Sequence, residues 1–160
     1  MLSVKLLCIG KLGEKFWAEA VREYEKRLSG YCKLEITELP EQRLPQSPTA
    51  GEISTALAKE ADAIRAKIPQ GASVVALCIE GQELSSEAFA DRLGTMATHG
   101  VSRLCLLIGG SCGLDEGLKR EAALRLSMSP MTFPHHLARV MALEQLYRAL
   151  NILAGGKYHK

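Results

Sequence analysis

The stretch Leu107-Ile-Gly-Gly-Ser-Cys-Gly-Leu-Asp-Glu-Gly117 joins the end of an apolar run to a segment with helical spacing. Glycine is favoured where a backbone must turn sharply or approach another group closely, so the pattern predicts a strand, a tight turn and a helix. Residues 109–113 also match G-x-S-x-G, the pattern around the nucleophilic serine of α/β-hydrolases. Two interpretations follow: either Ser111 is a nucleophile, or the glycines let the backbone close around a bound ligand.

The hydrolase interpretation needs an acid and then a histidine after the serine, and Ser111, Asp115 and His135 occur in that order. Asp115, however, falls in the first turn of the predicted helix, where the helix dipole and capping already favour an acid. An α/β-hydrolase also needs more strands than this chain can supply. A dinucleotide site is weakly supported, because the glycines are spaced G-G-x-x-G and not G-x-G-x-x-G. We therefore favour a compact ligand packed against bare peptide, with a purely structural turn as the alternative.

A chain of 160 residues is long enough for one hydrophobic core, so we expect a single domain over residues 1–160. Hydrophobic residues make up 47% and charged residues 24% of the chain. No apolar run approaches the ~20 residues that cross a bilayer, so we expect no membrane association. The first residues lead directly into a predicted strand without the features of a signal peptide, which favours the cytoplasm. The five cysteines form no C-x-x-C pair, so we expect no metal site.

Apolar runs that predict strands alternate along the chain with segments of helical spacing. The predicted strands cover residues 2–9, 32–39, 73–79, 102–108 and 126–131, and the predicted helices cover residues 14–29, 49–68, 85–99, 114–126 and 137–154. The central strands are apolar on both faces, which predicts an α/β fold with a largely parallel sheet between layers of helices. Residues 40–48 contain three prolines and no periodicity, and are predicted to be a mobile loop.

Ligands of open α/β sheets bind beyond the carboxyl ends of the strands. Three strand ends are therefore candidates, and we expect them to lie side by side. They are the segments 77–81, 108–110 and 128–134.

The final helix presents Leu143, Leu146 and Leu150 on one side, and Arg139 falls on that same side. A charged group there is costly unless it has a partner or faces a cleft, and we favour a functional role over a structural ion pair. The helix is apolar over more than half of its circumference, which leaves a face for a second subunit. The tail 157–160 carries a tyrosine, a histidine and two lysines, a composition suited to nucleotide contact.

Several motifs occur together in order: Leu106–Ser111 with Gly113, Leu126–His135, Arg139-Val140, Glu144–Arg148 and Tyr158–Lys160. As a set they resemble the bacterial large-subunit ribosomal RNA pseudouridine N3-methyltransferases, which are small members of the SPOUT or α/β-knot superfamily. The resemblance runs from the first strand to the last residue. It implies a homodimer, a trefoil knot in the C-terminal half, and S-adenosylmethionine (SAM) held in the knotted loops. It also implies a pseudouridine of the large-subunit (23S) RNA as the target, within the assembled 70S ribosome.

The positions of these motifs imply which residues form each site. The SAM site would be lined by Leu77, Gly109, Gly110, Met128, Ser129, Pro130, Met131, Thr132 and Phe133. The residues that contact RNA or take part in catalysis would be His135, Arg139, Arg148, Tyr158 and His159. We expect one of the two histidines to accept the N3 proton, and one of the two arginines to stabilise charge on the base carbonyls. A ribosome-associated RNA-binding factor without transfer chemistry is the competing hypothesis of another class.

Overall fold

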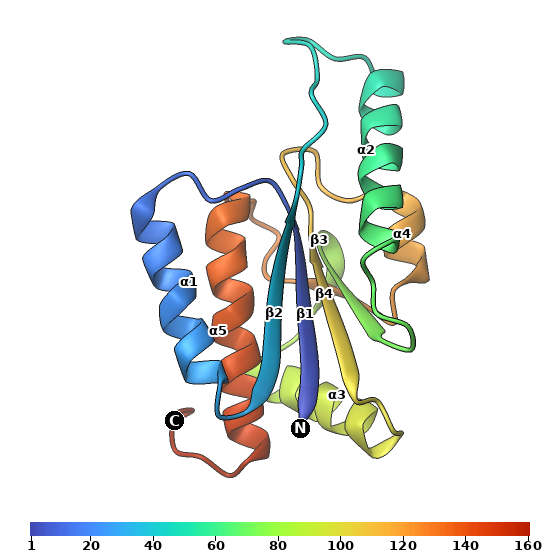
Figure 1. Ribbon diagram of the computed structural model, residues 1–160. Coiled ribbons are helices and arrows are strands. Elements are labelled where there is room, and N and C mark those ends of the chain that lie inside the picture. The colour runs from blue at the N-terminus through green and yellow to red at the C-terminus, as the bar shows by residue number, and fades with distance from the viewer.

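The computed structural model describes residues 1–160 and shows a five-stranded parallel sheet between two layers of helices (Figure 1). The strands are β1 (Leu2–Ile9), β2 (Cys32–Leu39), β3 (Ser73–Glu83), β4 (Arg103–Ile108) and β5 (Leu124–Ser127), and their order in the sheet is β2-β1-β4-β3-β5. The helices are α1 (Lys15–Leu28), α2 (Ala50–Arg65), α3 (Ser86–Thr98), α4 (Glu116–Glu121) and α5 (His135–Leu153). The predicted α/β class is confirmed, whereas the trefoil knot stays a prediction.

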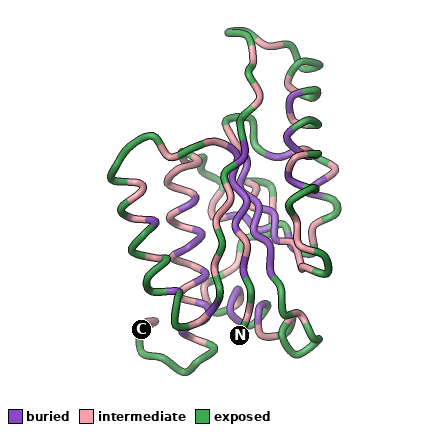
Figure 2. Tube along the Cα trace, viewed as in Figure 1, coloured by how far each residue is buried: buried purple, intermediate pink, exposed green.

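Each central strand is buried on both faces because successive side chains point to opposite sides of the sheet. On β1, Leu6 and Cys8 join a cluster of 20 buried residues with α1, α3 and α5, while Leu7 and Ile9 join a second cluster of 10 with α2 and α4. The buried residues accordingly run through the middle of the trace in Figure 2. This double burial is the physical reason why the strands read as uninterrupted apolar runs.

The segment 40–49 and the beginning of α2 project beyond the sheet in Figure 1, and we call them the arm. Residues 40–48 contain no helix or strand, as predicted. Thr49 caps α2 by accepting a hydrogen bond from the Glu52 N–H, and the Glu52 carboxylate accepts one in return from the Thr49 N–H. Within the loop, the Gln42 N–H donates to Glu60 Oε2 at 2.8 Å, so the arm is fastened to α2.

The region around β5 differs from the prediction. Helix α4 ends at Glu121, and β5 begins at Leu124 and ends at Ser127, in place of a helix to residue 126 and a strand over 126–131. Leu124 and Leu126 are buried on either side of the exposed Arg125, which is the alternation of a strand. Pairing with β3 therefore overrides the helical spacing of the segment.

Strand β3 is longer than predicted, because it continues beyond an irregularity between Leu77 and Gln82. Gly81 lies within this bulge, and a Cβ there would come within 2.8 Å of the Arg125 carbonyl group. Only glycine lets the two strands approach so closely. Helix α5 begins at His135, two residues before the predicted start, with Pro134 at its N-cap position. None of the five helices is long and apolar enough to cross a bilayer.

Candidate functional site

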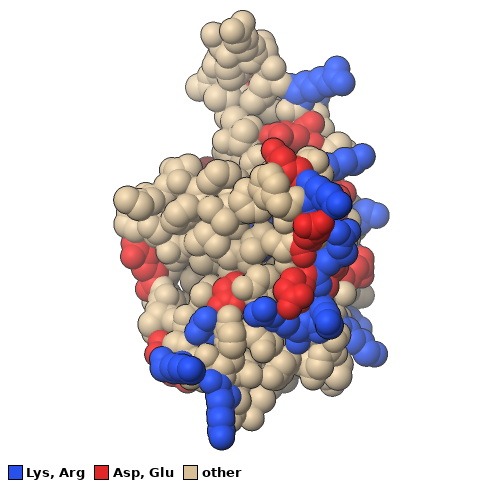
Figure 3. Space-filling view, turned by 90° about the vertical axis from the view of Figure 1, so that its left-hand side faces the viewer, with Lys and Arg blue, Asp and Glu red and all other residues tan.

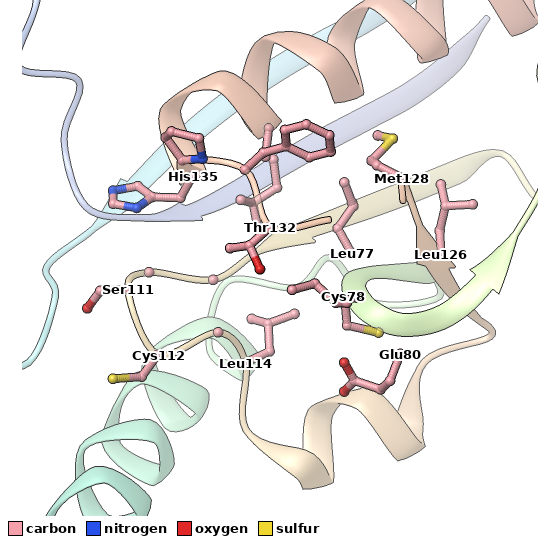
Figure 4. Close-up of a pocket in the computed structure, with 18 of the residues that line it drawn as sticks. Leu77, Cys78, Glu80, Ser111, Cys112, Leu114, Leu126, Met128, Thr132 and His135 are labelled. Atoms are coloured by element: carbon pink, nitrogen blue, oxygen red, sulfur yellow. The ribbon is translucent and has the colours of Figure 1, made fainter. Parts of the chain in front are cut away.

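A cavity of about 730 Å³ opens at the carboxyl ends of β3, β4 and β5, where the three candidate strand ends meet as predicted. Figure 4 shows Leu77, Leu114 and Thr132 converging on this cavity from three separate segments. Every residue predicted for the SAM site lines it except Ser129 and Pro130. Cys78, Ile79 and Glu80, in the predicted segment 77–81, also line it. Lining residues that were not predicted include Ser111, Cys112, Leu114, Lys119, Leu126 and Ala138.

The glycine turn, residues 109–113, closes on itself at the edge of the cavity. Gly110 and Gly113 form an antiparallel bridge, and the Gly113 N–H donates to the Gly110 carbonyl at 3.1 Å. A Cβ at Gly109 would collide with the backbone of Gly113, which itself has a φ of 78°. A Cβ at Gly110 would lie 2.6 Å from Glu41 Oε1. The chain itself therefore requires these glycines, in addition to any demand made by a ligand.

The hydrolase interpretation of Ser111 is wrong. Its hydroxyl donates to Glu41 Oε1 at 2.6 Å, and no histidine accepts from it. Asp115 caps α4 by accepting a hydrogen bond from the Gly117 N–H at 2.9 Å, as the capping argument predicted. A nucleophilic serine needs a hydrogen-bonded general base, and the three candidate residues do not form such a chain.

The loop between β5 and α5 covers another wall of the cavity. Ser129 does not line it, but its hydroxyl accepts a hydrogen bond from the Met131 N–H at 3.0 Å and so shapes the loop. Met131 is 72% exposed and Ile79 is 49% exposed, although both line the cavity. The mouth of the cavity is thus apolar and accessible.

An ion pair forms part of the polar lining. Lys119 Nζ donates to Glu80 Oε1 at 2.5 Å and to Glu116 Oε1 at 3.1 Å, although the lysine side chain is only 10% exposed. Burial alone would lower the pKa of Lys119, but the two carboxylates outweigh burial and raise it. Lys119 therefore stays charged and holds Glu80, in the irregular part of β3, beside the cavity.

His135 lies at the first residue of α5 and lines the cavity next to His136, with the ring centroids 4.3 Å apart. Burial lowers the pKa of His135, the neighbouring His136 and Arg139 lower it further, and Glu41 opposes the shift. The imidazole of His135 is therefore neutral near neutral pH. A neutral imidazole at a ligand cavity can accept a proton.

Arg139 lies near the cavity but does not line it. It is 2% exposed, and its Nη1 donates to Glu38 Oε2 at 2.6 Å while its Nη2 donates to the Gly10 carbonyl at 3.1 Å. Arg139 thus forms a structural ion pair, the alternative to the direct functional role that its position in the sequence favoured. The buried Nε of Arg139 has no hydrogen-bond partner.

The other three predicted RNA-contact residues gather at the far end of α5. Arg148 packs over the Tyr158 ring at 4.5 Å and lies 3.1 Å from His159 Nδ1, and Tyr158 donates to Glu144 at 3.1 Å. Figure 1 shows the C-terminus at the end of α5 opposite to the arm. Arg148 lies thirteen positions after His135 in the same helix, which is about 20 Å along the axis. Within one subunit, the tail and the cavity are therefore apart.

The tail is ordered by contacts with the rest of the subunit. The side chain of Asn151 accepts a hydrogen bond from the Tyr158 N–H at 3.1 Å, and His159 Nε2 lies 2.7 Å from Glu87 Oε1.

No group of three or more histidine, cysteine, aspartate or glutamate side chains in the structure is arranged as metal ligands would be.

Comparison with known proteins identifies relatives over the whole chain. Residues 2–159 match the family model described as "Predicted SPOUT methyltransferase". Proteins named "Ribosomal RNA large subunit methyltransferase H" from Streptococcus equi subsp. zooepidemicus (strain MGCS10565) and Bifidobacterium adolescentis are 42% and 44% identical to this chain. Both alignments cover 99% of this chain and 100% of the relative.

Solved structures share the fold at low sequence identity. A probable methylase family protein from Haemophilus influenzae Rd KW20 aligns with a TM-score of 0.53 and 13% identity, covering 98% of this chain and 70% of that chain. A Legionella pneumophila protein, described in complex with the bound cofactor SAM, aligns with a TM-score of 0.51 and 14% identity, covering 97% and 67% of the two chains.

Proposed function

The chain belongs to the SPOUT methyltransferase family, and on that premise we propose that it transfers a methyl group from SAM to large-subunit ribosomal RNA. The observation that carries the proposal is the match to relatives named for this activity over 99% of the chain. The cavity at the strand ends lies where α/β proteins bind ligands, which supports the same conclusion.

The cavity fits the cofactor in size and chemistry. Its volume of about 730 Å³ lies in the range of small-molecule sites, which are about 300–1,000 Å³. Leu77, Leu126 and Phe133 offer apolar contacts for a flat base, and the bare peptide of the glycine turn offers hydrogen-bonding groups. When bound, SAM supplies an activated methyl group on a sulfonium. We propose that the predicted residues Leu77, Gly109, Gly110, Met128, Met131, Thr132 and Phe133 hold it, and that Ser129 and Pro130 shape the loop.

The acceptor is proposed to be N3 of a pseudouridine, as the family resemblance implies. An imide nitrogen must lose its proton as it gains the methyl group, so the site needs a proton acceptor near the transferred group. We propose that His135 accepts this proton, because it lines the cavity and burial keeps its ring neutral. The rest of the protein's task is to hold the base and the methyl donor in line.

We propose that the working unit is a homodimer in which the tail of one subunit reaches the cavity of the other. Arg148, Tyr158 and His159 form one cluster, yet they lie at the wrong end of α5 to meet a base at the cavity of their own subunit. Figure 3, which views the molecule from the left-hand side of Figure 1, shows a broad central area without charged residues beside a column of mixed charges. Such a surface suits pairing with a second copy.

The proposal is tested by incubating the purified protein with radiolabelled SAM and either intact 70S ribosomes or protein-free 23S RNA, then mapping the modified nucleotide. Methylation at N3 of a pseudouridine on intact ribosomes is the expected result. A protein that binds ribosomes without SAM binding or transfer would favour the non-enzymatic RNA-binding factor. Methylation of a ribose or an ordinary uridine would contradict the proposed target.

A further inference from the structure

Glu41, in the arm, is bonded to the glycine turn across 70 residues of sequence. Its Oε1 accepts a hydrogen bond from the Ser111 N–H at 2.8 Å and another from the Ser111 hydroxyl at 2.6 Å. In Figure 4 the Ser111 side chain points away from the cavity. The carboxylate of Glu41 therefore binds the side of the turn that faces away from the cavity. The opposite side of the turn remains free to line the cavity.

Glu41 is itself held in place by its neighbour in the chain. The Gln42 N–H donates to Glu60 Oε2 at 2.8 Å, and Glu60 lies on α2 with only 6% of its surface exposed. One peptide of the arm is thus fastened on both sides, to α2 through Glu60 and to the glycine turn through Glu41. A shift of the arm would move the turn with it.

A glycine at position 110 leaves the space that the Glu41 carboxylate occupies. A Cβ at Gly110 would lie 2.6 Å from Glu41 Oε1 and 3.0 Å from the Glu41 carboxyl carbon, so any larger residue would displace Glu41. Gly109 is required for a different reason, because a Cβ at this position would collide with the backbone of Gly113. A Cβ at Gly110 would also lie 3.0 Å from Ile9 Cγ2, so the contacts with Glu41 and Ile9 together explain the second glycine.

We propose that Glu41 is a positioning residue for the cofactor: its carboxylate holds the glycine turn in the shape that binds SAM and couples that shape to the arm. The inference rests on the proposed function. A glycine-rich turn loses much conformational entropy when it is ordered, and a turn that is ordered beforehand spares the ligand that loss. Six consecutive residues from Gly109 to Leu114 line the cavity, so their order bears directly on cofactor affinity.

The test compares the full-length protein with Glu41→Ala and Glu41→Gln by calorimetric titration with SAM. We expect Glu41→Ala to raise the Kd for SAM about three- to tenfold, because exposed charge-assisted hydrogen bonds contribute modestly. Glu41→Gln keeps an acceptor oxygen and should recover most of the affinity. In ribosome methylation assays, the KM for SAM should rise while kcat at saturating SAM and the KM for ribosomes stay unchanged.

Two further variants separate positioning from a loss of folding. Gln42→Ala truncates the neighbouring side chain but keeps the backbone hydrogen bond to Glu60, so its Kd for SAM should match the wild type. Ser111→Ala should weaken binding less than Glu41→Ala, and should add little when combined with it, because both act on one contact.

Different results would overturn the positioning role of Glu41 and the proposed function. Folded Glu41→Ala with the wild-type Kd would overturn the positioning role and leave the proposed function standing. If Glu41→Ala does not fold, equal Kd values for the wild type, Glu41→Gln and Ser111→Ala would overturn it. A wild-type protein that does not bind SAM would overturn the proposed function together with the inference that rests on it.

Discussion

Glu38, near the end of β2, accepts a 2.6 Å hydrogen bond from Arg139, which lies 101 residues later in α5. Arg139 also donates to the Gly10 carbonyl, beyond the end of β1. One buried guanidinium thus joins the N-terminal part of α5 to the carboxyl edge of the sheet. The same oxygen of Glu38, Oε2, also accepts a hydrogen bond from the Leu12 N–H at 3.0 Å, which reinforces this link.

Arg139→Ala should therefore lower the free energy of unfolding by about 2–4 kcal/mol, because it removes a buried side chain and leaves Glu38 without its partner. Chemical denaturation of the purified protein measures this change. Glu38→Gln keeps an acceptor and should cost less. A loss of methyl transfer with unchanged stability in Arg139→Ala would instead favour the direct role in catalysis that the sequence first indicated.

The pH dependence of methyl transfer should report on His135. Burial holds its pKa below the ordinary value of 6.5, with His136 and Arg139 acting in the same direction and Glu41 opposing them. Only the neutral ring accepts a proton, so activity is complete above this pKa and falls as the pH drops through it. Measuring kcat between about pH 5 and 8 tests the prediction. Glu41→Gln should move the loss of activity to lower pH, because Glu41 raises the pKa of His135. An apparent pKa above 6.5 would contradict the proposed role of His135. An unchanged pH profile in His135→Gln would contradict it as well.

Gly81→Ala should destabilise the fold by about 1–3 kcal/mol, because its Cβ would come within 2.8 Å of the Arg125 carbonyl and force β3 and β5 apart. Thermal unfolding followed by circular dichroism measures the loss. Gly30→Ala is a suitable control, since a Cβ at Gly30 meets nothing within 4 Å. Equal stability of the two variants would show that the close strand contact is not required.

Shared sites can be tested by mixing subunits. If the cavity of one subunit works with the tail of its partner, His135→Ala and a variant lacking residues 157–160 should each be inactive alone. Unfolding and reassembling the two together at equal amounts should restore about a quarter of wild-type activity, because half of the dimers are mixed and each contains one intact site. No recovery in verified mixed dimers would indicate that each subunit uses its own tail.

The parts of the molecule that the sequence predicts are those with a local physical signal. Strands buried on both faces produce apolar runs, and in a parallel sheet their carboxyl ends must share one edge, so the three segments of the cavity were predictable. The SPOUT resemblance rests on residues clustered around that edge and the tail, and the family match confirms it. The α5 leucines were likewise predicted correctly, since Leu143, Leu146 and Leu150 are all buried.

The parts that escaped prediction depend on contacts between distant segments. Nothing near Glu41 in the sequence indicates that its carboxylate reaches Ser111, because the path of the arm has no periodicity. Lys119 occupies an ordinary helical position until Glu80 approaches it from β3. The start of β5 was misplaced for the same reason, since its pairing partner in β3 decides it.

Helix α5 places His135 at its first residue and the Arg148 cluster near its other end, on one continuous rod of 19 residues. An insertion or deletion of a single residue inside this rod would turn one end relative to the other by about 100° and change their spacing by about 1.5 Å. The arm, by contrast, can absorb changes of length in its outer part, between Arg43 and Thr49. Insertions and deletions among the relatives should therefore occur in the arm and be absent from α5.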